Sequence, residues 1–312
     1  MDVSVIIVTR NTGALTRAAV QSVLDSRDPL AKEIFVMDNA STDGTPAVFA
    51  REFPGVKLIR SETNLGFARA GNLAAKPAAG EFLLLLNSDA RLEPDALARA
   101  VAWMRANPDC AVAGAQLLNA DGSRQNSIAN FPTLATELLN KSLLRRLFPA
   151  WFPGKERKFS GPLEVDTVVG AFMLIRKSVW DALGGLDERF FFFFEETDFC
   201  LQAYRQGHRV IHLPEVHVRH HQGQSAKEDS AAARIEYWRS RYGYFVKNHR
   251  LPTRLVLAVG LGLRLWFNWL AAGLCTLATL GRSARWAARW RVCAGLIGWH
   301  LRGCPQQAGL PR

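Results

Sequence analysis

The stretch Phe82-Leu83-Leu84-Leu85-Leu86-Asn87-Ser88-Asp89 is an apolar run that ends abruptly in polar side chains. So short a run, bounded by Gly80 and by Glu93-Pro94, predicts a strand that is buried on both faces of a parallel sheet. Because ligands bind beyond the carboxyl ends of the strands in such sheets, we expect Asp89 at the rim of a site. The alternative is that residues 87–89 form only a polar turn, which caps a helix that begins at Pro94.

Apolar runs of strand length alternate with segments of helical spacing along most of the chain. This alternation implies right-handed βαβ crossovers and therefore an α/β fold with a mostly parallel central sheet. The predicted strands are Val3–Thr9, Glu33–Met37, Val56–Ile59, Phe82–Leu86, Val168–Ile175, Phe190–Phe194 and Val210–Leu213. The predicted helices are Ala14–Leu24, Gly44–Phe53, Phe67–Ala75, Pro94–Ala106, Lys177–Leu183 and Thr197–Arg205. Between Gln116 and Glu164 the periodicity fades, which predicts a long, partly helical excursion; one role for it would be to cover a substrate.

The composition of the chain changes near Leu251, which predicts a domain boundary. Residues 251–312 hold eight arginines but no lysine, aspartate or glutamate, and so supply +8 of the net charge of +11. They also hold five of the nine tryptophans. Interleaved Leu, Trp and Arg without lysine suits an anionic membrane surface better than nucleic acid, so no nucleic-acid partner is expected. We expect a catalytic domain at 1–250, with halves at about 1–115 and 116–250, and a membrane-associated helical tail at 251–312.

Two segments of this tail suit a membrane in different ways. Leu255–Leu280 is long enough to span a bilayer, but Arg264 in its middle would be costly there. Arg282–Arg291 places Arg and Trp three or four residues apart, as in a helix that lies in the interface. Packing of both segments on protein is the alternative. The scattered, odd-numbered cysteines and the lack of a basic-then-apolar leader favour the cytoplasmic face of the plasma membrane, with peripheral attachment expected rather than spanning.

Acidic side chains follow three predicted strands directly, at Asp38, Asp89 and the pair Glu195-Glu196. The topology would bring them to one edge of the sheet. Because converging carboxylates repel, they are typical of a cation site, a general base, or both, and hard oxygen ligands suit Mg²⁺ or Mn²⁺ on a diphosphate. The chain has no GxGxxG after its first strand and no GxxxxGK[ST], which excludes a dinucleotide Rossmann site and a P-loop.

Four segments of the first half occur in a distinctive order: Val3–Asn11, Val36–Thr45, Asn64–Asn72 and Asn87–Asp89. Together with segments of the second half, as far as Ser225, this order resembles the family 2 glycosyltransferases of the GT-A fold, and more narrowly their bacterial rhamnosyltransferase-type branch. The resemblance implies nucleotide contacts from the first strand and its loop, a pyrimidine contact from Asp38, and a nucleotide border at the NxGFaxaxN-like element. The donor-binding residues implied in this way are Thr9, Asn11, Asp38, Asn64, Gly66, Phe67, Asn72 and Asn87.

The Asn87-Ser88-Asp89 segment stands where the family has its DxD-type motif. Because its first position is Asn87 rather than an acid, the resemblance implies that metal binding rests mainly on Asp89. In the second half, Gly170–Arg176 is similar to the strand that floors the acceptor side, with Gly170 and Ala171 at its start. The segment from His220 to Ser225 resembles the HxxGxS element, whose histidine would complete the metal or pyrophosphate site.

Glu195-Glu196-Thr197-Asp198 is similar to the family's ExD-like pattern, in which the second acid is the catalytic base. That position is Glu196 here, although Glu195 and Asp198 stay open as alternatives. The resemblance implies an inverting transfer of a sugar, with L-rhamnose from dTDP-rhamnose preferred, to a glycan or polyprenyl-diphosphate-linked acceptor in cell-surface polysaccharide synthesis. The alternatives are another donor (UDP-galactofuranose, UDP-GlcNAc or UDP-glucose) and a non-catalytic, membrane-bound glycan-binding scaffold.

Overall fold

The computed structural model describes residues 1–149, 151–152, 159–221 and 230–312, and the chain forms two compact units. The first unit comprises Met1–Phe131, Arg145–Ser225 and Arg312, and the second comprises Pro132–Leu144 and Ala226–Pro311. The second unit therefore begins before the compositional break at Leu251, and it also includes a part of the excursion.

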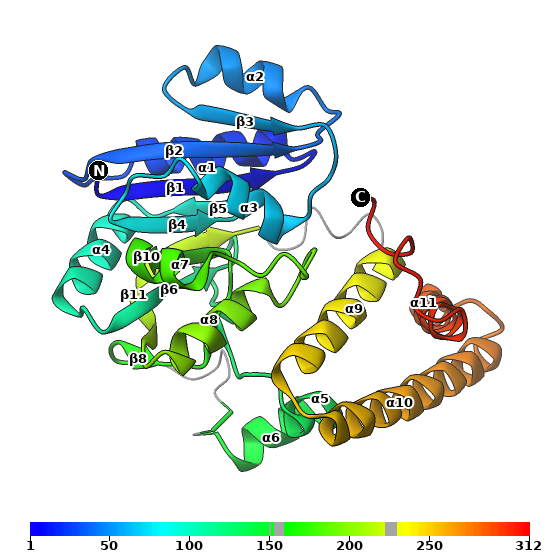
Figure 1. Ribbon diagram of the computed structural model, residues 1–312. Coiled ribbons are helices and arrows are strands. Elements are labelled where there is room, and N and C mark those ends of the chain that lie inside the picture. The colour runs from blue at the N-terminus through cyan, green and yellow to red at the C-terminus, as the bar shows by residue number, and fades with distance from the viewer. Residues whose placement is uncertain (150, 153–158, 222–229) are drawn as a thin grey trace. The chain divides into compact units, whose positions relative to one another are not determined.

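The first unit is built on one mixed, mostly parallel sheet, in the order β3-β2-β1-β4-β10-β6-β11-β5, with β8 on β11 (Figure 1). β1 runs parallel to β2 and β4, and β6 runs parallel to β11, whereas β10 is antiparallel to both of its neighbours. The strands are β1 (Val3–Thr9), β2 (Lys32–Asn39), β3 (Lys57–Ser61), β4 (Phe82–Leu86), β5 (Ala90–Leu92), β6 (Cys110–Leu118), β8 (Leu163–Glu164), β10 (Phe172–Arg176) and β11 (Arg209–His220).

Helices cover both faces of this sheet. One core holds side chains of α1, α2 and α4, and the other holds side chains of α3, α7 and α8. Phe82, Leu84 and Leu86 of β4 belong to the first core, and Leu83 and Leu85 to the second, which confirms the predicted burial of this strand on both faces. The helices are α1 (Gly13–Leu24), α2 (Thr45–Glu52), α3 (Phe67–Ala75), α4 (Ala96–Ala106), α7 (Lys177–Leu183) and α8 (Glu195–Arg205).

Three sequence-based predictions of strands differ from the structure. Phe190–Phe194 was predicted as a strand, but it forms a bend before α8, in which Phe193 and Phe194 have φ angles of 71° and 72°. The predicted strand Val168–Ile175 is broken, because its start pairs as β9 (Thr167–Val168) with β7 (Ile128–Ala129) in a separate two-stranded sheet. The strand predicted to end at Leu213 continues to His220, since an irregularity in the pairing with β6 accommodates Pro214.

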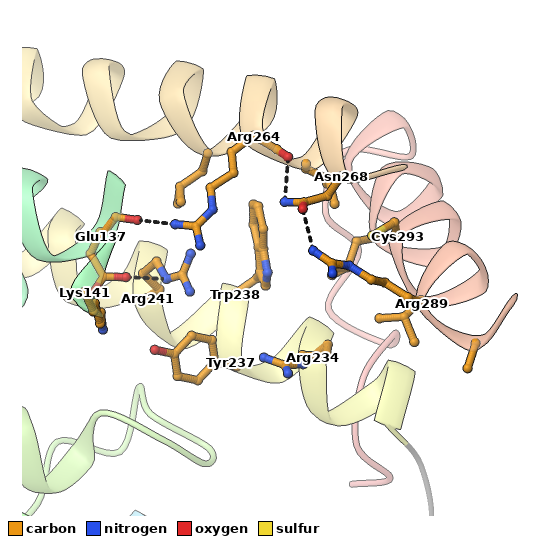
Figure 2. A pocket seen from close by; sticks show the side chains of 15 residues that line it. Glu137, Lys141, Arg234, Tyr237, Trp238, Arg241, Arg264, Asn268, Arg289 and Cys293 are labelled. Carbon is orange, nitrogen blue, oxygen red and sulfur yellow. Dashed lines mark hydrogen bonds and ion pairs between the residues drawn. The ribbon is translucent and has the colours of Figure 1, made fainter. Parts of the chain in front are cut away.

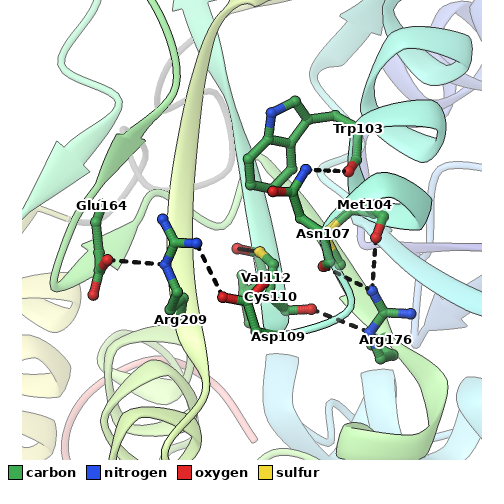
Figure 3. A network of polar contacts seen from close by, with 9 residues as sticks. All are labelled: Trp103, Met104, Asn107, Asp109, Cys110, Val112, Glu164, Arg176 and Arg209. Carbon is green, nitrogen blue, oxygen red and sulfur yellow. Dashed lines mark hydrogen bonds and ion pairs between the residues drawn. The ribbon is translucent and has the colours of Figure 1, made fainter.

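Arg176 at the end of β10 braces the sheet (Figure 3). Its guanidinium donates to the carbonyl oxygens of Met104, Asn107 and Cys110 at 2.7, 3.2 and 3.1 Å. These bonds join β10 to the turn between α4 and β6. Burial raises the pKa of the neighbouring Cys110 thiol to about 12, so this cysteine is a packing residue and no nucleophile.

The second unit is helical, and its long helices are α9 (Ser230–Asn248), α10 (Leu251–Ala278) and α11 (Ala284–Leu301) (Figure 1). α10 contacts α9, α11 and the short helix α5 (Leu134–Leu138); α6 (Lys141–Leu147) follows α5 in the chain. Among the described residues, α10 is the helix long and apolar enough to cross a membrane by length and composition, a test that core helices of soluble proteins also pass.

Candidate active site

The parallel pairing of β1 and β2 places Thr9 beside Asp38 at the ends of the two strands. The residue Asp38 is 2% exposed, and its Oδ1 atom has no hydrogen-bond partner in the part of the chain that the structure describes. An unsatisfied buried oxygen costs about 1–3 kcal/mol, so such an atom typically serves a ligand that donates a hydrogen. Asp38 is therefore an open acceptor at this edge of the sheet.

The hydroxyl of Thr9 lies in a buried cluster. It shares hydrogen bonds with the Thr16 and Thr12 hydroxyls at 2.7 and 3.0 Å, and the Thr12 hydroxyl donates to Ser88 Oγ at 3.1 Å. This cluster links the loop after β1 to the Asn87-Ser88-Asp89 segment. The side chain of Thr9 thus positions that segment, which the sequence pattern did not indicate.

Asn11 connects the loops that follow β1 and β2. It adopts a left-handed conformation with φ 54°, which asparagine tolerates better than most residues. Its Oδ1 accepts hydrogen bonds from the Thr42 amide at 2.7 Å and from the Thr42 hydroxyl at 3.3 Å, and its own amide donates to Ser41 Oγ at 3.0 Å. These bonds hold the two loops together beside Asp38.

Asn39 organises the segment that begins at Asn64. Its Nδ2 donates to Asn64 Oδ1 at 2.8 Å, and its Oδ1 accepts the Leu65 amide at 2.7 Å. Gly66 follows with φ 77°, and a Cβ there would lie 2.6 Å from Phe191 Cδ2 and closer still to the Phe191 carbonyl oxygen. Only glycine fits this approach. Asn39 was not predicted from the sequence, in which its only signal is its place directly after Asp38.

The bend at Phe190–Phe194 closes over α3, because the Phe67 amide donates to the Phe191 carbonyl oxygen at 2.7 Å. Asn72, further along α3, exchanges two hydrogen bonds of 2.8 Å with the backbone of Leu186, and it also donates to Glu188 Oε1 at 3.1 Å. The amide of Asn72 is thus engaged in holding the loop that leads to α8, and its predicted contact with the nucleotide stays a prediction.

Asp89 and His220 meet at the end of β4. Both residues are 7% exposed, and His220 Nε2 lies 3.3 Å from Asp89 Oδ1. The backbone amide of His221 donates to the Asp89 carbonyl oxygen at 2.9 Å. Asn87 forms the turn before them: its amide donates to the Ala171 carbonyl oxygen at 3.1 Å, and its carbonyl oxygen accepts the Ala90 amide at 3.0 Å. The motif is therefore attached to both β10 and β11.

Gln125 determines which ring nitrogen of His220 carries a hydrogen. The Nε2 atom of Gln125 donates to Asn119 Oδ1 and to the His220 carbonyl oxygen, which orients the amide. Its Oε1 then faces His220 Nδ1 at 3.0 Å, so Nδ1 must carry a hydrogen. If the ring is neutral, Nε2 directs a lone pair at Asp89 Oδ1. The two atoms then repel each other unless a cation binds both of them. No sequence pattern pointed to Gln125.

The acidic cluster lies in the first turn of α8. Glu195 and Asp198 are 6% and 2% exposed, and Asp198 Oδ1 accepts a hydrogen bond from Gln202 at 3.2 Å. Glu196 is less buried as a residue, but its carboxylate is surrounded by protein. This desolvation raises the pKa of Glu196 above its usual range, although backbone amides of Glu196 and Thr197 partly offset the shift.

Gly170 lies beside this glutamate. A Cβ at Gly170 would be 3.7 Å from both Cβ and Cγ of Glu196, which is an ordinary van der Waals distance. Ala171, the next residue, is fully buried. Glu196 is partly exposed as a residue, and its pKa is raised above the usual range of a glutamate.

The family profile described as "Glycosyl transferase family 2" matches residues 4–184 of the chain. This chain belongs to the family 2 glycosyltransferases. Like its family, it is a glycosyltransferase.

Two curated relatives are rhamnosyltransferases. The N-acetylglucosaminyl-diphospho-decaprenol L-rhamnosyltransferase of Mycobacterium tuberculosis is 28% identical over 254 residues, which are 74% of this chain and 81% of the relative. The rhamnosyltransferase WbbL of Escherichia coli is 25% identical over 198 residues, which are 61% and 73% of the two chains. The chain is thus similar to the rhamnosyltransferase-type branch of the family.

Solved structures support the GT-A fold. The mannosyltransferase PcManGT of Pyrobaculum calidifontis, in complex with GDP-Man and Mn²⁺, aligns with a TM-score of 0.56 at 19% identity, over 96% of this chain and 86% of that one. The S. aureus protein TarS 1–349, in complex with UDP-GlcNAc, aligns with a TM-score of 0.53 at 18% identity, over 98% and 82% of the two chains.

The residues at the end of β4 fit a divalent cation in this glycosyltransferase. The carboxylate of Asp89 and Nε2 of His220 converge at 3.3 Å, and both groups can bind a divalent cation. No cluster of three or more His, Cys, Asp or Glu side chains occurs in the described parts of the chain. Further ligands would then come from water and a diphosphate, as is usual for Mg²⁺. The rest of the HxxGxS-like element, Gln222 to Ser225, lies outside the described residues.

Proposed function

We propose that this glycosyltransferase transfers L-rhamnose from dTDP-rhamnose, with inversion, to a hydroxyl of a glycan or of a polyprenyl-diphosphate-linked acceptor in cell-surface polysaccharide synthesis. The named activities of the Mycobacterium tuberculosis and Escherichia coli relatives support the sugar. One observation carries the proposal: three kinds of group occur together in the catalytic unit. They are the buried acceptor oxygen of Asp38, the Asp89–His220 pair, and Glu196 with its raised pKa.

Asp38 supports a pyrimidine nucleotide. Among the described residues nothing donates to its buried Oδ1, and thymine and uracil both present a ring N–H that could do so. The hydrogen bonds of Asn11 and Asn39 hold the surrounding loops, so the site is organised before the nucleotide arrives. Asn64, Gly66 and Phe67 would border the nucleotide from the other side.

The chemical step follows from the placement of the acids. The acceptor hydroxyl attacks the anomeric carbon from the face opposite to the diphosphate, Glu196 takes its proton, and the bond from that carbon to the diphosphate oxygen breaks. A raised pKa makes Glu196 a stronger base than an ordinary glutamate. Asp89 and His220 would hold Mg²⁺ or Mn²⁺, which when bound neutralises charge on the departing nucleotide diphosphate.

A panel of nucleotide sugars tests the donor. The full chain is incubated with a polyprenyl-diphosphate-linked sugar as acceptor and with dTDP-rhamnose, UDP-galactofuranose, UDP-GlcNAc or UDP-glucose as donor, each with and without Mn²⁺, and the released nucleotide is measured. We expect release of dTDP from dTDP-rhamnose, dependent on the metal. Release of UDP from one of the other sugars would replace the donor and leave the rest of the mechanism intact. Binding of a sugar nucleotide without release from any donor and acceptor would favour the non-catalytic scaffold.

We also propose that α10 attaches the protein to the cytoplasmic face of the membrane. Exposed apolar side chains recur on it every three or four residues and form one stripe. Arg264 lies on the opposite side of the helix, where its guanidinium donates to the Glu137 carbonyl oxygen at 3.1 Å. A helix with such an arrangement suits the interface better than a span. The apolar stripe consists of Leu255, Val259, Leu263, Trp266, Leu270, Leu274 and Leu277.

Flotation with liposomes tests the attachment on the full chain. The double variant Leu263→Gln, Leu270→Gln interrupts the apolar stripe, whereas Leu24→Gln changes an exposed leucine of α1. We expect the first variant to float less than the parent and the second to float equally. Equal flotation of all three proteins would contradict the proposal.

A further inference from the structure

A second candidate site lies wholly within the helical unit. Side chains of α5, α6, α9, α10 and α11 line an open pocket with a volume of about 600 Å³ (Figure 2). On α10 the lining residues are Leu261, Arg264, Leu265 and Asn268, which helical spacing places opposite to the apolar stripe. The pocket is thus separate from the surface proposed for the membrane.

The pocket is strongly cationic. One carboxylate, that of Glu137, stands among its lining side chains, and its oxygens already lie 3.5 Å from Lys141 Nζ and 3.1 Å from Arg241 Nε. Charges of one sign that converge on a cavity raise the local concentration of the opposite ion. The basic side chains that line it are Lys141, Arg234, Arg241, Arg264 and Arg289.

Besides the ion pair of Arg241 with Glu137, neutral contacts hold the guanidinium groups in place. Arg289 Nη2 donates to Asn268 Oδ1 at 2.7 Å, and Asn268 Nδ2 in turn donates to the Arg264 carbonyl oxygen at 2.8 Å (Figure 2). The guanidinium of Arg241 lies 4.8 and 5.2 Å from the ring centroids of Tyr237 and Trp238. Since a guanidinium has five N–H donors and these contacts use few of them, most of the donors can serve a ligand.

Arg234 projects toward the same pocket from α9 (Figure 2). Among the described residues it forms no hydrogen bond or ion pair. Planar, fixed guanidinium groups recognise phosphate by paired hydrogen bonds better than flexible lysines do.

We propose that this pocket binds a phosphate- or diphosphate-bearing anion, at a site separate from that of the sugar nucleotide. The diphosphate of a lipid-linked sugar, the headgroup of an anionic phospholipid and free pyrophosphate share this chemistry. The volume accommodates a diphosphate together with a group the size of a sugar. The inference does not depend on which donor the catalytic unit uses.

A titration of the full chain with inorganic pyrophosphate tests the site. It is carried out in the presence of EDTA and monitored by tryptophan fluorescence, because Trp238 lies in the pocket. We expect saturable binding, weakened at least about tenfold by the double variant Arg234→Gln, Arg289→Gln. The control Arg285→Gln, Arg291→Gln removes two exposed arginines of α11 that do not line the pocket, and it should bind as the parent does. Equal affinities of parent, variant and control would overturn the proposal, as would an equal loss in both variants.

Two further variants and a lipid comparison complete the test. Arg234→Gln alone removes a side chain without a partner among the described residues, so it gives a readout if the double variant fails to fold; unchanged affinity in both would overturn the site. Asp89→Asn must leave the binding of pyrophosphate intact, since loss there would assign the signal to the catalytic unit. Flotation with phosphatidylglycerol vesicles, compared with phosphatidylcholine vesicles, identifies the source of the anion. If the double variant floats less than the parent with phosphatidylglycerol only, the ligand is a lipid headgroup. If the double variant differs from the parent only in its affinity for pyrophosphate, the ligand is a soluble anion.

Discussion

His220 Nε2 lies 3.3 Å from Asp89 Oδ1, although the two residues are far apart in the sequence. β5 and β11 bring them together, since Ala90 pairs with His220 in the antiparallel register of these strands. The position of the histidine is thus set by the strand that follows the aspartate.

Asp89→Asn should remove the stimulation of sugar transfer by Mn²⁺. The amide keeps the shape of the side chain but provides no charge for a cation, so kcat/KM should fall by more than about 100-fold, the upper range seen for changes around metal ligands. Metal titration and donor turnover measure it. Asp95→Asn, at an exposed ion pair with Arg99, is the matched control and should change neither. Metal-stimulated activity in Asp89→Asn would exclude Asp89 as the ligand.

Gln125→Leu should weaken the binding of Mn²⁺ by about 10- to 100-fold. The leucine cannot accept the hydrogen of His220 Nδ1, so the ring is free to present the wrong tautomer to Asp89. Paramagnetic titration of Mn²⁺ separates this effect from catalysis. Gln206→Leu, at the exposed end of α8, controls for the loss of an amide. An unchanged affinity would reduce Gln125 to a packing residue.

Glu196→Gln should lower kcat by about 10²- to 10⁴-fold while the KM of the donor changes little, because only proton transfer is lost. Glu215→Gln, whose side chain is 75% exposed, should behave like the parent. A normal kcat in Glu196→Gln would move the role of the base to Glu195 or Asp198, which the same assay can examine.

The pH dependence of kcat should report the same residue. Desolvation raises the pKa of Glu196, and only the ionised carboxylate accepts a proton. Activity should therefore fall with decreasing pH along a limb that lies above the ordinary glutamate value of about 4.3. A limb at or below that value would show that another group is the base.

Gly66→Ala should destabilise the fold more than Gly44→Ala does. Both glycines have positive φ angles, of 77° and 80°. Gly44 lies in the left-handed region, where an alanine costs about 1–2 kcal/mol, whereas Gly66 has ψ 177°, a conformation that is essentially restricted to glycine and costs about 1–3 kcal/mol. A Cβ at Gly44 meets nothing within 4 Å, whereas one at Gly66 collides with Phe191, which adds about 1–3 kcal/mol. Urea unfolding compares the two. An equal loss of unfolding free energy in the two variants would mean that Phe191 moves away from the new Cβ at no cost.

His212 should make the protein less stable in mild acid. The residue is fully buried in β11, and desolvation, helped by the nearby charge of Arg124, lowers its pKa to about 4 from 6.5. Between these values the unfolded chain binds a proton that the folded chain does not, so stability falls as the pH drops, by up to about 3 kcal/mol.

The variant His212→Leu isolates this effect. The difference in unfolding free energy between pH 7.5 and 5 should be smaller in this variant than in the parent. His217→Gln, at an exposed position of the same strand, should leave the difference unchanged. A parent and a His212→Leu variant with the same pH dependence would contradict the assignment.

Elements with a strong local pattern were predicted well from sequence. Val3–Thr9, Phe67–Ala75 and Lys177–Leu183 have the bounds expected of them, since apolar periodicity and the following turns determine such elements locally. Phe190–Phe194 has the composition of a strand, but its backbone binds α3 at Phe67 instead of a neighbouring strand. β6 was not predicted at all, because its small and apolar residues show no distinct alternation.

The sequence by itself determined the α/β class, the buried strand β4, the order of the motifs and hence the family, because each depends on short runs of residues. Only the tertiary structure decided that β10 runs antiparallel, that Gln125 directs His220 toward Asp89, and that the arginines of the second unit surround a pocket. Those relationships join residues distant in the chain, and long-range pairing, unlike periodicity, leaves no local pattern.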